Sequence, residues 1–172
     1  MKRRTKLVVG VSGLVTALVA GAVFARSTSS SLAEPAAVDI AAAGDIACDP
    51  AYPDFNAGSG TAVGCHEKAT SDLVAKINPK AVLALGDIQY VHGSLANYAA
   101  SYDPTWGRFK AITRPVLGNH EGGEGGTNTT YFEYFGQNAG VRTQGYYSYD
   151  LGAWHLIALN SNCGAYSLQP FP

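Results

Sequence analysis

Three short apolar segments, each ending in a glycine and an oxygen-bearing side chain, most constrain what this chain can fold into. They are Val38–Ala43 before Gly44-Asp45, Ala81–Leu85 before Gly86-Asp87, and Pro115–Leu117 before Gly118-Asn119-His120-Glu121. Apolar runs of this length, bounded by turn-forming residues, are typical of buried strands. Between the first two, apolar positions at helical spacing predict a helix over His66–Asn78. Because a helix separates these strands, the pattern predicts an α/β layered fold.

Further elements are expected along the rest of the chain. They are a helical region at Leu95–Ile112 interrupted at Pro104, a single helical turn at Tyr131–Phe135, and strands at Tyr146–Asp150 and Trp154–Leu159. The short segment between the last two strands contains Gly152 and predicts a hairpin. His155 lies in an apolar strand, so we expect a buried core histidine rather than a ligand.

Two carboxylates and an amide follow the three predicted strands. The carboxyl ends of parallel strands meet at one edge of a sheet, so Asp45, Asp87 and Asn119 are expected to share a crevice. The glycine before each of them would let the backbone turn without a Cβ in the way. Oxygen donors of this kind bind hard cations, and a cation removes the repulsion between crowded carboxylates. Taken singly, either aspartate could instead cap a helix.

The order of the segments suggests a role for each side chain. Asp87 follows the middle segment, which makes it the candidate to bridge two metal ions about 3.5–4 Å apart. Asp45 would then hold one ion and Asn119 the other. His120 could hydrogen-bond a substrate phosphate oxygen or protonate the leaving group, and is the candidate catalytic residue.

The motifs Gly-Asp, Gly-Asp-x-x-Tyr and Gly-Asn-His-Glu occur in this order after the apolar segments. From Asp39 to about Asn162, the chain resembles the calcineurin-like metallophosphoesterase family. Ala47 stands where many members have a histidine, and Tyr90 lies three residues after Asp87; both details resemble the purple acid phosphatases. The resemblance implies a two-sheet β-sandwich flanked by helices, with a dinuclear site at the strand ends. It also implies that Tyr90 is a tyrosinate ligand of iron, beside a second ion of zinc, manganese or iron.

The same resemblance implies a secreted phosphoesterase that hydrolyses phosphate monoesters with a metal-activated hydroxide. Its partner would be a small phosphate ester, and phosphodiester or nucleotide substrates stay open. The family completes its site with later histidines, and none follows His155 here, so we expect a truncated domain over residues 38–172. The alternatives are a catalytically inactive fragment of such an enzyme and an extracellular binding module with a tyrosine-rich surface. Tyr90 could also simply pack with its hydroxyl at the surface.

The N-terminal segment predicts secretion. Four basic residues precede an apolar run at Leu7–Phe24, which indicates a signal over residues 1–25, and residues 26–37 form a polar linker. We expect a secreted or cell-envelope-exterior protein, with no stable membrane partner unless the segment stays uncleaved as an anchor. Removing residues 1–25 leaves eight basic and thirteen acidic residues. This balance argues against nucleic-acid binding, which requires a basic face.

Two cysteines bracket a loop rich in turn-forming residues. Export makes a disulfide between Cys48 and Cys65 possible, and it would stabilise the fold by about 3 kcal/mol in the chain-entropy model. Their spacing fits no zinc pattern. Cys163 is left over, as a free thiol or as one that has lost its partner.

Overall fold

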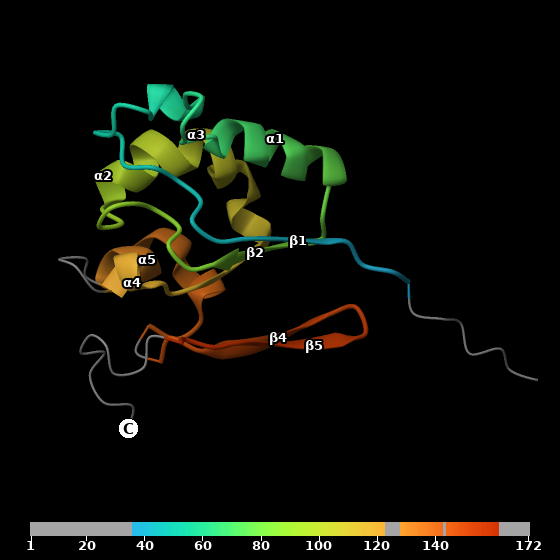
Figure 1. Cartoon of the computed structure of the whole chain (residues 1–172). Coiled ribbons are helices and arrows are strands. Elements are labelled where there is room, and N and C mark those ends of the chain that lie inside the picture. The colour runs from blue at the N-terminus through green and yellow to red at the C-terminus, as the bar shows by residue number, and fades with distance from the viewer. Residues whose placement is uncertain (1–35, 123–127, 143, 162–172) are drawn as a thin grey trace, which may run out of the picture. The chain divides into compact units, whose positions relative to one another are not determined.

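In the computed structural model, a parallel sheet of three strands positions the candidate site. The strands are β1 (Ile40–Ala43), β2 (Ala81–Leu85) and β3 (Thr113–Val116), in the order β1-β2-β3 (Figure 1). The register pairs Ala43 with Ala84 and Leu85 with Val116, so the three carboxyl ends lie at one edge. The three predicted strands are therefore confirmed, with β2 in the middle of the sheet.

The structure describes residues 36–122, 128–142 and 144–161, which belong to a compact unit running from Glu34 to Pro172. The predicted signal, most of the predicted linker and Cys163 lie outside these described residues. Within them, mixed helices and strands form a parallel three-stranded sheet and an antiparallel pair.

Five α-helices and four other helical segments accompany the strands in the described part of the chain. The α-helices are α1 (Glu67–Ile77), α2 (Leu95–Asn97), α3 (Asp103–Thr105), α4 (Asn119–Gly122) and α5 (Asn128–Phe135). The 3-10 segments are Asn56–Gly58, Trp106–Ile112 and Gly136–Ala139, and Tyr98–Tyr102 is a π-helical turn. The helix predicted after the first strand is confirmed as α1.

The helical region from Leu95 to Ile112 is continuous, so the predicted interruption at Pro104 is wrong. The π-helical turn directly precedes α3, and Pro104 lies in the first turn of that helix. Inside an α-helix, proline lacks the needed N–H and its ring crowds the preceding turn. The wider π turn makes room for the ring, and the first turn is the place where helices tolerate proline.

α1 packs against the rest of the fold through a partly polar face. Of the apolar positions expected to hold this helix, Val74 is buried, whereas Leu73 and Ile77 are exposed. Glu67 and Ser71 are buried in their place. Hydrogen bonds from the helical region after β2 reach both of these polar residues. Polar contacts as well as apolar burial therefore hold α1.

Aromatic side chains make up much of the core. The buried rings are Tyr98, Tyr102, Trp106, Phe109, Tyr131, Phe132, Tyr134 and Phe135. Four of these rings come from α5, which is longer than the single turn predicted there. The rings of Tyr98 and Tyr134 stack with centroids 4.2 Å apart. Packing among the rings stabilises a helix that its local sequence indicates only weakly.

The remaining strands form the predicted hairpin, β4 (Tyr147–Leu151) and β5 (Trp154–Ala158), on the side of the sheet opposite α1 (Figure 1). His155 is exposed, and its Nδ1 lies 2.7 Å from Asp150 Oδ1, so the expectation of a buried histidine is wrong. Apolar neighbours on β5 are exposed as well. The apolar sequence of this strand therefore did not imply burial.

Candidate metal centre

Asp45 and Asp87 leave the sheet edge in the left-handed backbone conformation. The angle φ is 54° at Asp45 and 47° at Asp87. Residues with a Cβ seldom adopt this region, although Asp does so more readily than most. Pairing also continues beyond the strands, since Ile46 N donates to Asp87 O at 3.1 Å and Ala47 N to Ile88 O at 3.0 Å. This continued pairing holds both aspartates at the same edge of the sheet.

The three glycines before the candidate ligands differ in whether a Cβ could be accommodated in their place. Gly86 has a φ of 90°, and a Cβ added to it would lie 2.9 Å from Gly118 Cα. A Cβ on Gly118 would overlap the Asp87 side chain. At Gly44, in contrast, the nearest atoms would lie 3.5 Å from a Cβ, which is ordinary contact. The expected need for glycine holds at Gly86 and Gly118 and is wrong at Gly44.

Tyr90 connects the two aspartates. Its hydroxyl donates a short hydrogen bond to Asp45 Oδ1 and lies 3.5 Å from Asp87 Oδ2. Burial raises the pKa of the Tyr90 phenol, and the hydrogen bond to Asp45 and the negative charge of Asp87 raise it further. With no cation present, the phenol therefore keeps its proton between two carboxylates. A cation held by these oxygens would replace that proton as the positive charge.

His120 lies against the same group, next to Asn119 at the start of α4. Its backbone N–H donates to Asp87 Oδ1 at 3.1 Å, and its ring centroid lies 4.4 Å from that of Tyr90. The ring Nδ1 is 2.7 Å from Val91 O. A carbonyl oxygen only accepts hydrogen bonds, so Nδ1 carries a proton and Nε2 is left for other partners. The structure thus brings α4 and its candidate residues to the edge that carries Asp87.

Glu121 is a residue of this site whose role the sequence did not indicate. It is 1% exposed, and its carboxylate accepts hydrogen bonds from four backbone N–H groups. The donors are Asp87 at 3.0 Å, Ile88 at 2.7 Å, Gln89 at 3.3 Å and Gly118 at 2.9 Å. Burial raises the pKa of the Glu121 carboxyl, and the bonds from Gly118, Ile88 and Gln89 act against that rise.

These contacts make Glu121 a clamp on the candidate ligands. The side chain is anchored on α4, and its oxygens fix the backbone of Asp87 and of the two residues after it, which lie more than thirty residues away in the sequence. No local pattern marks such a role, because the four donors are backbone groups and the contact exists only in the fold.

A second network fixes the loop that carries Tyr90. The buried Gln89 side chain donates through Nε2 to Cys48 O at 2.9 Å and to Tyr90 O at 3.0 Å. Asp49 Oδ2 accepts from Val91 N at 3.2 Å. Cys48 is joined to Cys65 by a disulfide. The loop after β1 therefore supports the loop after β2 through side-chain and backbone hydrogen bonds.

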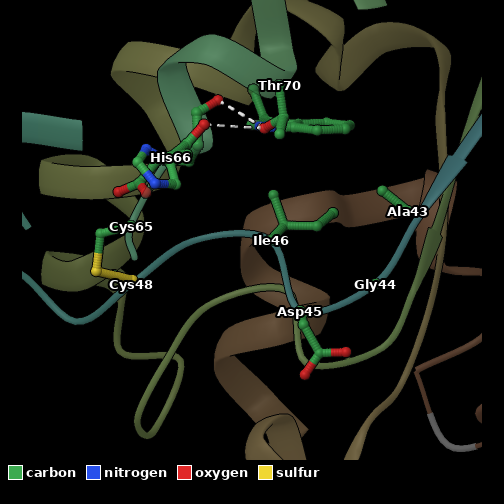
Figure 2. Close-up of a pocket in the computed structure, with 10 residues that line it drawn as sticks. Ala43, Gly44, Asp45, Ile46, Cys48, Cys65, His66 and Thr70 are labelled. Carbon is green, nitrogen blue, oxygen red and sulfur yellow. Dashed lines mark hydrogen bonds between the residues drawn. A yellow bond between two sulfur atoms is a disulfide. The ribbon is translucent and has the colours of Figure 1, made fainter. Parts of the chain in front are cut away.

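The Asp45 carboxylate faces away from the neighbouring cavity (Figure 2). That cavity, of about 240 Å³, lies beside the disulfide and is lined by residues that include Ile46, His66 and Thr70. Figure 2 shows Ile46 directed toward the cavity and the Asp45 carboxylate directed away from it. Asp45 thus presents its oxygens on the other side of the chain, where Tyr90 contacts them.

The donor set fits hard metal ions. Two carboxylates and a phenol oxygen meet at one point, and an asparagine and a histidine lie on the adjoining helix. Carboxylate and other oxygen donors are the ligands that hard cations prefer. Asp45, Asp87, Tyr90 and Asn119 could therefore hold metal, with His120 beside them.

No protein-family model matches this chain, and no curated protein or solved structure is significantly similar to it. Among the described residues, no helix is long and apolar enough to cross a membrane. The Cys48–Cys65 disulfide is the kind of bond that persists in oxidising compartments, including the extracellular space.

Proposed function

We propose that this chain is a secreted metallophosphoesterase of the calcineurin-like type, with the corresponding β-sandwich flanked by helices. Its reaction would be the hydrolysis of phosphate monoesters at a dinuclear centre of iron with zinc, manganese or iron. The observation that carries this proposal is the contact of one phenol oxygen with two carboxylates at the carboxyl edge of a parallel sheet. The order of the Gly-Asp and Gly-Asn-His-Glu motifs supports it.

The candidate ligands divide between two positions. Asp45 and Tyr90 lie on one side of Asp87, and Asn119 begins the helix on its other side, after β3. Asp87 comes from the middle strand and is the natural shared ligand. Metal ions bound here would supply Lewis-acid activation of water and neutralise the phosphoryl oxygens.

His120 is the candidate proton donor. Val91 O orients the ring by accepting from Nδ1, and Tyr90 packs against it. Nε2 is then free to donate a proton to a substrate oxygen when the imidazole is protonated, or to accept one when it is neutral. Glu121 positions the backbone around Asp87 and contributes no proton transfer of its own.

Metal content and turnover, measured together, test this proposal. The purified chain is supplied with iron, zinc and manganese, and elemental mass spectrometry is combined with hydrolysis of an aryl phosphate monoester. We expect bound metal and turnover, both lost in Asp87→Ala. Asp150→Ala is the matched control, since its side chain is 81% exposed on the hairpin; it should leave both readouts unchanged.

Other outcomes would change the proposal in defined ways. Metal bound through Asp87 without turnover of monoester or diester would identify a catalytically inactive relative of these enzymes. The absence of bound metal would reject the phosphoesterase proposal for this chain. Turnover that survives both chelation and Asp87→Ala would reject a metal-dependent mechanism.

A further inference from the structure

An apolar cavity of about 210 Å³ lies between strands β2 and β3 of the parallel sheet and the β4–β5 hairpin. Leu83, Leu85 and Val116 line it from the sheet, and Leu156 and Ile157 line it from the hairpin. Leu85 and Ile157 are 56% and 67% exposed, so the cavity is open to solvent. Sites for drug-sized ligands have volumes of about 300–1,000 Å³. This cavity therefore suits a smaller molecule with a short apolar chain.

Arg114 brings a positive charge to the lining of the same cavity. Its guanidinium carbon lies 5.3 Å from the centroid of the Tyr149 ring, which is also part of the lining, and its Nη1 donates to Thr113 O at 3.2 Å. A guanidinium has five N–H donors, and this hydrogen bond uses one of them. Among the described residues, no carboxylate forms an ion pair with Arg114. The remaining donors can therefore bind an anion that enters the cavity.

We propose that this cavity binds a free medium-chain fatty-acid anion, whose carboxylate pairs with Arg114. A guanidinium binds both oxygens of a carboxylate, whereas a neutral apolar ligand would desolvate the charge without a partner. The register pairs Leu83 with Arg114 and Leu85 with Val116. The apolar wall thus continues for two residues beyond the guanidinium, about 6.6 Å along the strands, and the alkyl chain packs there. The lining contains none of the candidate metal ligands, so the proposal does not depend on phosphoesterase activity.

Octanoate binding to the full chain tests this inference, by calorimetry at a protein concentration where sedimentation shows monomer. We expect one octanoate per chain. Arg114→Gln should weaken binding by about tenfold or more, because the ligand loses a charged hydrogen-bond partner. Arg142→Gln is the matched control, since it removes the same charge from a side chain that is 58% exposed and outside the lining, and it should leave the affinity unchanged. An unchanged affinity in folded Arg114→Gln would overturn the proposal.

Two further ligands test the proposal on the unmodified chain, where folding of a variant plays no part. Octanol lacks the charge and should bind about tenfold more weakly than octanoate, or weaker still. Each buried methylene raises affinity by up to about fourfold, so butanoate should also bind at least about tenfold more weakly. Equal binding of octanol would reject the ion pair, and equal binding of butanoate would reject the apolar site for the chain. Octanoate that fails to bind the monomer would reject the fatty-acid ligand and leave a second copy of the chain as the occupant to test.

Discussion

Two aspartates at the candidate metal centre occupy a backbone region that disfavours most side chains. Asp45 and Asp87 each follow a glycine, and both aspartates have a positive φ, as Gly86 also does. A residue with a Cβ in this conformation costs about 1–2 kcal/mol relative to its usual regions. Strain of this kind concentrates at functional sites, where the side chain is retained for what it binds. The positions of Asp45 and Asp87 at the candidate metal centre fit this pattern.

Replacing Asp45 separates backbone strain from ligand chemistry. Asp45→Gly and Asp45→Ala both remove the carboxylate, but only glycine adopts a φ of 54° without strain. We expect Asp45→Gly to unfold with a free energy about 1 kcal/mol higher than Asp45→Ala. Denaturant unfolding in chelator measures this difference. Equal stability, or a more stable alanine variant, would contradict the left-handed conformation.

Glu121 presents the opposite case, in which one carboxylate stabilises several backbone groups. Glu121→Gln replaces an accepting oxygen with an NH₂ group that faces backbone N–H donors. Leaving buried donors unsatisfied costs about 1–3 kcal/mol. We expect the unfolding free energy to fall by about 2 kcal/mol, measured by denaturant titration. The exposed control Glu133→Gln should stay within about 0.5 kcal/mol of the parent; a similarly small effect at Glu121 would show that the clamp is dispensable.

At the scale of elements, the strands and their polar ends were predictable, because an apolar run followed by glycine is a local signal. The limits of helix α1 were predictable, but the residues on its buried face were not. Trp106 Nε1 donates to Glu67 O at 3.0 Å, and Arg108 donates to Ser71 Oγ at 2.6 Å. These partners lie more than thirty residues away, so the spacing of apolar residues could not reveal a polar inner face. The Glu121 clamp escaped prediction for the same reason.

Glu67, on the buried face of α1, should make the free energy of unfolding depend on pH. Desolvation raises the pKa of Glu67 above its ordinary 4.5. Hydrogen bonds from the Glu67 backbone, the Ser101 side chain and the Cys48 backbone oppose the rise, as does the nearby His66. The folded state then binds more protons than the unfolded state, so this group stabilises the fold below pH 4.5. Its contribution is lost as the pH rises through the raised pKa.

Glu67→Gln removes this titration. Between pH 4.5 and 7, the unfolding free energy of the parent should fall relative to that of the variant, because only the parent must bury an increasing charge. Denaturant unfolding at several pH values measures the difference. Other carboxyls, such as Asp72, whose pKa Arg108 lowers, contribute equally to parent and variant, so their pH-dependent contributions cancel in the comparison. A difference that stays constant with pH, or that changes in the opposite direction, would show that burial does not raise the pKa of Glu67.

At the scale of the whole molecule, an apolar surface remains between the sheet and the hairpin. Leu85, Ile157 and Leu159 are 56%, 67% and 68% exposed, and they line a cavity of about 210 Å³ with Val116 and Tyr149. We call these three exposed side chains the hairpin patch. Contiguous apolar surface of this kind promotes association between protein molecules in water. Helix α1 lies on the other side of the sheet (Figure 1).

The hairpin patch should therefore make the chain associate as its concentration rises. The double variant Ile157→Lys and Leu159→Lys places two charges on the patch, which opposes association by repulsion and by loss of apolar area. Sedimentation velocity should show an average sedimentation coefficient that rises with concentration in the parent and stays flat in this variant. Val63→Lys with Val141→Lys is the charge-matched control, since these valines are 84% and 57% exposed and neither lines the cavity at the patch, and it should associate like the parent. A parent that stays monomeric would contradict the prediction. A control that abolishes association equally well would assign the effect to net charge and not to this surface.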